Sequence, residues 1–423
     1  MRQPKGWGLM VLGWLTMGCG AAALPQTAVP EPRGPTAGTA APASFTQGLE
    51  AMAQHDRARD WSEGSCKATV ELLLAGSPRP AARYDAGLVQ QRCHHDADAQ
   101  THFEAALAQD PGFYPARAAL AIARAAERGK PGDLDRSIAE LGRAVRDARF
   151  GDAPLLTTLA ALQVQRRSGV ADDEGGDDLE RATKNLHRAL AIDDGNMPAL
   201  NQLALLHLER ARGAGGKAAT QALELAALVC AQAIAKDPGF APIHNTAGLV
   251  EVELGDLSRA AASFDEARRR DPHLVEAQMN LAALNLQVRG FSRAEEAYRA
   301  VVAQRPDDYD ARLGLAVAIR AQIDDATEAA RVAAATAEIA EAKRIAPERP
   351  EAYFNEAILV QEYGGRKSDP GAARANLARA RGLYEQFLAR ASGAPALAVL
   401  RERAEGRLQD IRILTEETLH QVP

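Results

Sequence analysis

The chain has 423 residues, of which 4% are aromatic and 25% are charged, and its formal net charge is -6. Acidic and basic residues are mixed along it, and no basic patch with interleaved aromatic residues appears, so the composition excludes the usual classes of nucleic-acid-binding protein. Alanine is abundant and strand-like alternation is rare. Small side chains let helix axes approach closely, so the composition predicts an all-α fold of tightly packed helices.

Residues 1–19 have the pattern of an export signal. Arg2 and Lys5 supply a positive start, and an apolar run from Trp7 to Met17 follows. This run is too short for a comfortable transmembrane helix. The pattern therefore predicts that the chain is exported.

The end of this segment, Leu15-Thr16-Met17-Gly18-Cys19, resembles a bacterial lipoprotein signal. In that family a small residue precedes the cysteine that receives the lipid, as Gly18 precedes Cys19. Thr16 departs from the pattern, because an aliphatic residue is usual at its place. The resemblance implies lipidation of Cys19, a membrane contact through the lipid, and a location on the periplasmic side of the outer membrane. An ordinary secretory signal or an uncleaved anchor, with Cys19 incidental, is the alternative.

Residues 20–44 are rich in alanine, proline, threonine and glycine. Such a segment buries too little apolar surface to offset the entropy of ordering it. We expect it to be a flexible tether between the signal and a folded domain.

An internal period of 34 residues organises the rest of the chain. Three pairs of similar residues show it: Ala260 and Ala294, Phe264 and Tyr298, and Pro272 and Pro306. A small pair, Ala247-Gly248, precedes the first set. The small residues suit a point where two helices cross, the aromatic residue fills the space between repeats, and the proline ends a helix.

This pattern resembles that of the tetratricopeptide-repeat (TPR) family. The resemblance covers residues 45–393 in about nine repeats, several of them longer than 34 residues. It implies an all-α solenoid, a right-handed superhelix in which each repeat is a helix A, a turn and a helix B. Residues 394–423 are expected to form a capping helix and tail, because a terminal repeat must end the stack with a solvated face.

Two cysteines lie where antiparallel helices of neighbouring repeats meet. Cys66 is early in helix B of the first repeat, and Cys93 is at the end of helix A of the second. A Cys66–Cys93 disulfide is therefore expected in an oxidising compartment, and two separate buried thiols are the alternative. Cys230 takes the aromatic place of its repeat and is expected to be a buried thiol.

No catalytic or metal-binding constellation stands out from the sequence. His94, Asp98 and His102 have a spacing that resembles a metal site, but the repeat frame places a helix break between His95 and Ala99, so a polar turn is favoured. No phosphate loop, nucleophile elbow or zinc-protease helix appears. We therefore expect no enzyme activity, no cofactor and no metal.

The TPR resemblance implies that helix A side chains line a concave groove that binds protein segments. An asparagine there can hydrogen-bond the backbone of a bound peptide, and apolar side chains beside it offer pockets. For any single residue, ordinary helix surface is the alternative. The expected groove residues are Asn201, Leu205, Glu209, Asn245, Leu249, Glu253, Met279, Gln287, Arg320 and Phe354.

In layout the chain resembles exported TPR lipoproteins of gliding bacteria and pilus pilotins. This implies a non-catalytic scaffold or assembly factor of a cell-envelope machine for motility, pili or secretion, with other envelope proteins as partners. The alternatives are an envelope enzyme-accessory or glycan-binding module, and a structural spacer. Glycan binding favours exposed aromatic residues, yet Trp61 is the only tryptophan in the repeat region.

Overall fold

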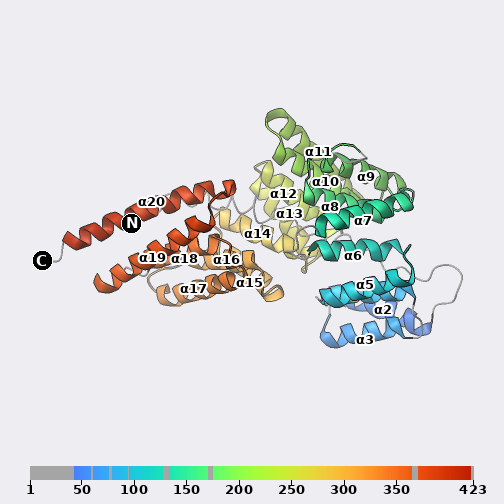
Figure 1. Ribbon diagram of the computed structural model, residues 1–423, viewed down its shortest axis with the longest axis horizontal. Helices are drawn as coiled ribbons and strands as arrows, with labels where there is room; N and C mark the ends of the chain where they lie inside the picture. The colour runs from blue at the N-terminus through green and yellow to red at the C-terminus, as the bar shows by residue number, and fades with distance from the viewer. Residues whose placement is uncertain are drawn as a thin grey trace. The chain divides into compact units, whose positions relative to one another are not determined.

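A computed structural model describes residues 42–58, 61–75, 79–93, 95–126, 133–169, 175–363 and 370–420. Within these ranges the chain forms nineteen α-helices and one short 3-10 helix, without strands (Figure 1). The helices belong to two compact units, one ending at Leu254 and the other beginning at Gly255. Residues 1–19, with Cys19, and most of the predicted tether lie outside the described residues.

The first unit holds α2 to α12. Their bounds are α2 (Ala43–Ala58), α3 (Glu63–Leu74), α4 (Pro80–Arg92), α5 (Asp96–Gln109), α6 (Tyr114–Ala126), α7 (Asp133–Asp147), α8 (Ala153–Arg166), α9 (Asp178–Ile192), α10 (Met197–Gly213), α11 (Gly216–Lys236) and α12 (Ala241–Glu253). The second unit holds α13 (Leu257–Arg270), α14 (Val275–Gln287), α15 (Phe291–Gln304), α16 (Tyr309–Arg320), α17 (Glu328–Ile345), α18 (Glu351–Tyr363), α19 (Pro370–Arg390), the 3-10 helix η2 (Pro395–Leu397) and α20 (Ala398–His420).

Successive helices pack in pairs, as the repeat pattern predicts. In the first unit α4 packs on α5, α8 on α9 and α10 on α11, and in the second α14 packs on α15, α16 on α17 and α18 on α19. The first member of each pair is helix A and the second is helix B. This arrangement confirms an all-α solenoid of the TPR type.

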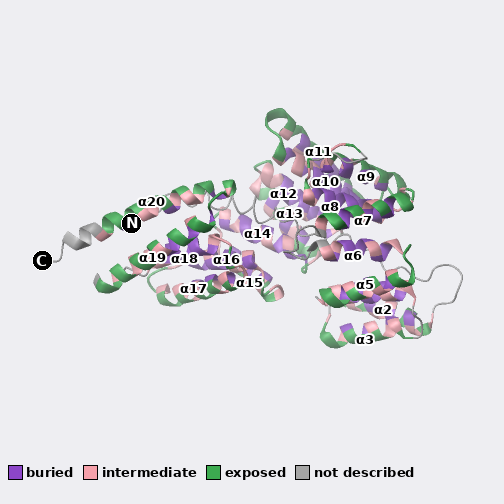
Figure 2. Cartoon of the chain, viewed as in Figure 1, coloured by how far each residue is buried: buried purple, intermediate pink, exposed green. Residues whose placement is uncertain are grey.

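The small and aromatic positions of helix B are buried. In six helices B these side chains are at most 3% exposed: Ala99, Phe103 and Ala106; Ala182, Leu186 and Ala189; Ala226, Cys230 and Ala233; Ala260, Phe264 and Ala267; Ala294, Tyr298 and Val301; and Ala335, Ile339 and Ala342. Helix A is buried more completely, because it lies between its own helix B and the neighbouring repeats. In α8 the buried residues run almost without a break, whereas α17 has three, and Figure 2 shows this contrast.

A short turn joins each helix B to the next helix A. Five helices B end two residues before a proline, at Pro111, Pro238, Pro272, Pro306 and Pro347. In four turns the residue just after helix B is an aspartate whose side chain accepts a hydrogen bond from the backbone N–H two residues on, at 2.8 to 3.0 Å: Asp110, Asp193, Asp237 and Asp271. At Asp193 the turn forms although Asp194 replaces the usual proline, so the aspartate can set the turn alone.

The C-terminal helix α20 packs on α19 and η2 through one face. Ala404 and Ile411 on that face are buried, while Val399, Ile413 and Leu414 are exposed. By length and composition, α11 alone among the described helices would suit a membrane span. One side of α11 is buried in the solenoid, however, at Ala226, Cys230 and Ala233.

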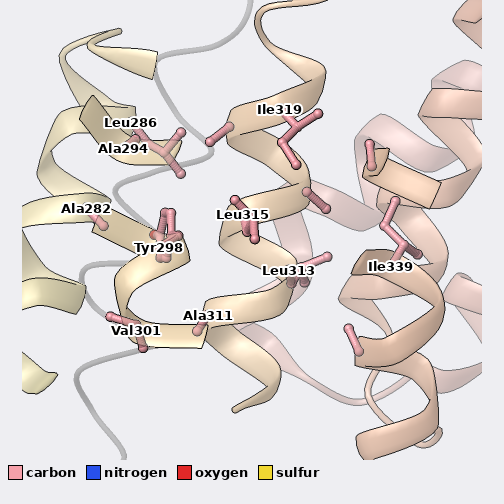
Figure 3. Close-up of a cluster of buried hydrophobic side chains, with 14 of the residues drawn as sticks. Ala282, Leu286, Ala294, Tyr298, Val301, Ala311, Leu313, Leu315, Ile319 and Ile339 are labelled. Carbon is pink, nitrogen blue, oxygen red and sulfur yellow. The ribbon is translucent and has the colours of Figure 1, made fainter. Parts of the chain in front are cut away.

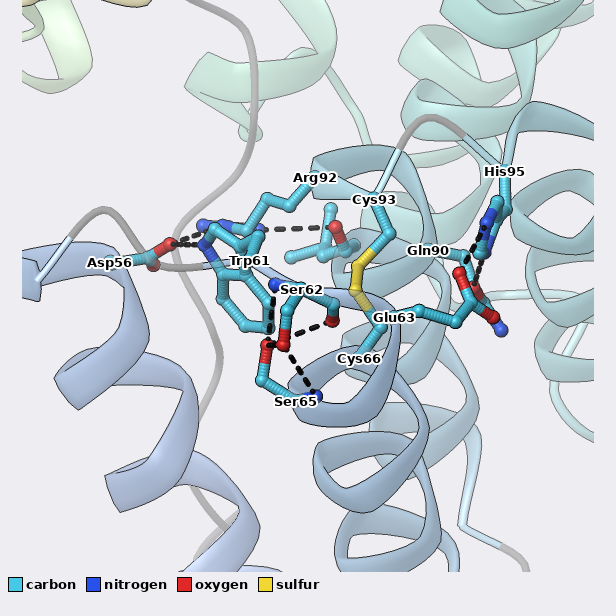
Figure 4. The surroundings of a disulfide bond; sticks show 11 residues. Asp56, Trp61, Ser62, Glu63, Ser65, Cys66, Gln90, Arg92, Cys93 and His95 are labelled. Atoms are coloured by element: carbon cyan, nitrogen blue, oxygen red, sulfur yellow. Dashed lines mark hydrogen bonds and ion pairs between the residues drawn. A yellow bond between two sulfur atoms is a disulfide. The ribbon is translucent and has the colours of Figure 1, made fainter.

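A disulfide joins the first two helix pairs (Figure 4). It links Cys66 in α3 to Cys93, just after α4, across a Cα–Cα distance of 6.3 Å. Close by, Asp56 accepts hydrogen bonds from Arg92 Nε at 2.6 Å and from Trp61 Nε1 at 3.0 Å. The structure thus contains the pairing that the helix geometry predicts.

The remaining described cysteine, Cys230, is buried at the aromatic place of α11. Burial raises the pKa of its thiol to about 12, which keeps the thiol protonated and unreactive near neutral pH.

We expect the double substitution Cys66→Ala/Cys93→Ala to lower the free energy of unfolding of the N-terminal repeats. The bond closes a segment with a sequence separation of 27 residues, and the chain-entropy estimate for such a loop is about 3 to 4 kcal/mol. Thermal melts with and without a thiol reductant check this. The reductant should lower the melting temperature of the unsubstituted chain and leave the double variant unchanged; an equal response of both chains would contradict the bond.

Tyr298 fixes how closely α15 and α16 approach. Its ring is fully buried and points from α15 toward α16, where Leu313 and Leu315 flank Gly314 (Figure 3). A Cβ atom added at Gly314 would overlap the Tyr298 ring. A glycine is therefore needed at this place in α16 for steric reasons.

Gly314→Ala should destabilise the chain, whereas Gly382→Ala in α19, whose added Cβ meets no atom within 4 Å, should not. Alanine favours a helix over glycine by about 1 kcal/mol, but overpacking a core costs about 1 to 3 kcal/mol. We expect a net loss of about 1 to 2 kcal/mol for Gly314→Ala and a small gain for Gly382→Ala, measured by urea unfolding. A gain for both would show that the ring moves aside freely.

Candidate protein-binding face

In the first unit, helices α10 and α12 carry six of the predicted groove residues. Four of these side chains are half-buried and reachable from solvent, and we call them the α10–α12 face: Leu205, Glu209, Asn245 and Glu253. Asn201 and Leu249 are buried, at 3% and 8% exposure. The six positions therefore form two layers, of which only the outer one can touch a partner.

The inner layer connects the two helices. Asn201 Oδ1 in α10 accepts a hydrogen bond from Thr246 Oγ1 in α12 at 2.7 Å, and both side chains are buried. A hydrogen bond between buried side chains removes the penalty of leaving either group unsatisfied, so it favours one spacing of α10 and α12. Asn201 thus supports the face from below and does not form part of its surface.

A row of ion pairs runs along the C-terminal ends of α8, α10 and α12. Glu209 accepts from Arg167 Nη1 at 2.5 Å and from Arg212 Nη1 at 3.0 Å, and Arg212 Nε reaches Glu253 at 2.7 Å. Arg167 ends α8 in the left-handed conformation, with φ of 52°. Two carboxylates thus meet two guanidinium groups, and the ends of three helices A are held together. The sequence pattern predicts Glu209 and Glu253 as separate binding residues and does not indicate these arginines.

In the second unit, two predicted groove residues are half-buried and two are in the interior. Met279 and Gln287 lie on α14, and Met279 packs partly against the core. Phe354 and Arg320 are only 2% and 4% exposed. The prediction that these two side chains line an open groove is therefore corrected.

The interior position of Phe354 follows from packing within one helix pair. Its ring contacts Tyr384 and Phe387 of α19, at centroid distances of 5.8 Å and 5.1 Å. Arg320 is buried beside Glu362 and Tyr384; burial lowers the pKa of its guanidinium, and Glu362 opposes that shift. Helix A is covered on several sides, so the repeat frame identified the right helix but not which way each side chain points.

Of the residues considered for a metal site, Asp98 and His102 lie in α5, which a turn separates from α4. Helix α4 ends at Arg92 and α5 begins at Asp96, and His95 lies between them with its Nε2 3.2 Å from Glu63. His94 lies outside the described residues. Within the ranges that the structure describes, no group of three histidine, cysteine, aspartate or glutamate side chains is placed to hold a metal ion.

Asp85 in α4 is a buried acid that the repeat pattern does not single out. It is 0% exposed, and within the described part of the chain neither carboxyl oxygen has a hydrogen-bond partner. Burial raises its pKa to about 8, while the nearby Arg92 acts in the opposite direction. The only signal in the sequence is a lone acid within the apolar stretch of a helix A. At neutral pH this side chain is a neutral acid in the core.

Asp85 should make the stability of the chain depend on pH. Its pKa in the folded state, about 8, exceeds the ordinary 3.8, so between these values the folded state holds a proton that the unfolded state releases. Stability should therefore fall as the pH rises through this window, by up to about 1.4 kcal/mol per pH unit. Asp85→Asn should remove this slope in urea unfolding from pH 5 to 9. The exposed Asp147→Asn is the control, and an unchanged slope in Asp85→Asn would refute the assignment.

No family model matches the chain, and no curated protein matches it. Solved structures similar to it include a thermophilic TPR protein of Thermus thermophilus, with 25% identity and a TM-score of 0.40 over 45% of this chain and 92% of that one. A TPR protein of Parabacteroides merdae has 18% identity and a TM-score of 0.39 over 66% and 93% of the two chains. YrrB, described as a TPR protein with an unusual peptide-binding site, has 15% identity and a TM-score of 0.36 over 51% and 97%.

Proposed function

We propose that this chain is a non-catalytic scaffold that binds a partner protein on the α10–α12 face. The observation that carries the proposal is that Leu205 and Asn245 are half-exposed on a surface fixed from two sides. The hydrogen bond from Thr246 to Asn201 holds it from below, and the row of ion pairs holds the helix ends. A rigid surface binds a segment without the entropy cost of ordering itself.

The chemistry of the face favours a peptide segment with an apolar anchor. Leu205 offers apolar contact, and the Asn245 amide can both donate to and accept from a peptide backbone. Glu209 and Glu253 are already neutralised by arginines, so the rim gives little attraction to a strongly basic partner. We therefore expect recognition through shape and backbone hydrogen bonds more than through net charge.

The proposed setting is the cell envelope. The export pattern of residues 1–19, ending at Cys19, supports delivery out of the cytoplasm. The Cys66–Cys93 disulfide supports an oxidising compartment, because such bonds are rare where thiols are kept reduced. We propose a lipid anchor at Cys19, a site on the periplasmic side of the outer membrane, and partners in a motility, pilus or secretion apparatus.

A glycan-binding or enzyme-accessory role is less well supported. Trp61 is the tryptophan that could stack on a sugar, but its Nε1 donates to Asp56 and its ring lies 5.2 Å from that of His55. It therefore belongs to the packing around the disulfide and does not form an open aromatic platform. The face on α10 and α12 carries no aromatic side chain at its half-buried positions.

Site-specific photocrosslinking tests the face. A photoreactive amino acid at position 205 or 245 of the full chain, expressed in its own cells, should capture the same defined set of proteins from both positions. The matched control is position 221, an exposed glutamine on the helix B α11, which should not capture that set. Identical products at all three positions would contradict a specific face.

Cys19→Ala tests the anchor separately from the face. We expect the unsubstituted chain to sediment with outer membranes and the variant to become soluble in the periplasm, with weaker capture at position 205. Release from the membrane with unchanged capture would show that the face works without the anchor. Sedimentation of both chains alike would refute lipidation at Cys19.

A further inference from the structure

A pocket lies on the helix B side of the first unit, between the end of α7 and α9. The pocket has a volume of about 450 Å³ and is lined by Arg146, Phe150, Arg181, Lys184, Asn185 and Arg188. Four of these six side chains carry a positive charge, and none is a carboxylate. Small-molecule sites have volumes of about this size, and the basic lining favours an anionic ligand.

The floor of the pocket is a fixed polar network. Arg181 is 2% exposed and pairs with Asp178 at 2.6 Å, and Asp178 also pairs with Arg166 at 2.7 Å. Asn185 is 1% exposed and donates to Gln163 of α8 at 3.2 Å. These contacts hold one wall of the pocket, α9, against α8.

The outer wall carries charge that the chain itself does not neutralise. Lys184 and Arg188 are exposed on α9, one turn apart, and neither has a carboxylate partner among the described residues. Arg188 Nη1 lies 3.5 Å from the Asn185 oxygen, and its guanidinium lies 4.3 Å from the centre of the Phe150 ring. A guanidinium stacked on a ring keeps its N–H edge available for an anion.

Phe150 reaches this position through a strained turn. Arg149 and Phe150 have φ values of 50° and 57°, the only adjacent pair of non-glycine residues with positive φ in the described part of the chain. The Phe150 N–H donates to the Val145 carbonyl at 2.9 Å, which closes the end of α7. Backbone strain of this kind tends to persist where the position of a side chain matters.

In a neighbouring pocket, acidic side chains neutralise an arginine. This pocket lies between α5, α6 and α7, has a volume of about 490 Å³, and contains both arginines and glutamates. There Arg124 pairs with Glu104 at 2.9 Å and with Glu140 at 3.4 Å. Among the residues described, no acid lines the pocket between α7 and α9, and Lys184 and Arg188 have no carboxylate partner there, although Asp178 pairs with Arg181 at its floor.

We propose that the pocket between α7 and α9 binds the phosphate group of an anionic ligand, with Arg146, Lys184 and Arg188 around the phosphate. Several cations converging from two helices suit a dianion, whereas one guanidinium satisfies a carboxylate. The volume exceeds that of inorganic phosphate, which leaves room for an organic part. A soluble phosphorylated molecule and a phospholipid headgroup share this chemistry.

Isothermal titration of the full chain with inorganic phosphate, and with succinate as a dicarboxylate, tests the chemistry. Phosphate should bind, and succinate should bind at least tenfold more weakly. Lys184→Gln/Arg188→Gln should weaken phosphate binding at least tenfold. Lys217→Gln/Arg293→Gln, which removes the same charge from exposed positions elsewhere, should bind as the unsubstituted chain does. All four side chains are exposed, and a thermal melt confirms that each variant is folded.

Three results would overturn the proposal: no phosphate binding, equal affinity for succinate, or equal weakening in both double variants. Vesicles then distinguish the source of the phosphate. Binding to phosphatidic acid vesicles but not to phosphatidylcholine vesicles, lost in Lys184→Gln/Arg188→Gln, would identify a lipid headgroup. Phosphate binding without vesicle binding would identify a soluble phosphorylated ligand.

Discussion

The close crossing of helix A over helix B is the contact on which the rest of this structure depends. Where helix B of one repeat meets helix A of the next, it requires a small residue opposite a large one, as Gly314 of α16 and Tyr298 of α15 show. Because the pair repeats, each helix A is enclosed while each helix B keeps an open side. The two candidate sites follow from this asymmetry: the α10–α12 face is on helices A, and the basic pocket is between two helices B.

The fold could be predicted from the sequence because its determinants recur at a fixed period. Phe264 and Tyr298, 34 positions apart, are both fully buried, and the Cys66–Cys93 pairing followed from the same frame. The face of helix A could not be predicted as well. Periodicity identifies one apolar stripe, but a helix covered on several sides has no single stripe. That is why Arg320 and Phe354, expected at the surface, are in the interior.

Contacts between repeats were missed for a different reason. Arg167 and Glu209 are 42 residues apart, and Arg212 and Glu253 are 41 apart, because these repeats are longer than 34 residues. Because the repeats differ in length, ion pairs between neighbouring repeats have no common sequence separation by which they could be predicted. The left-handed backbone at Phe150 could not be predicted either, because a glycine usually indicates this conformation and position 150 is not a glycine.

The disulfide also determines how a pulling force would travel through the chain. A load applied to the residues before α2 would unwind α2 and the start of α3, and would then reach Cys66. From there it would pass through the covalent bond to Cys93. The residues between the two cysteines would carry no tension, and beyond the bond the packing of α4 on α5 would be the next non-covalent contact to resist. The disulfide would thus limit the extension of the first repeat under load to a fixed, short length.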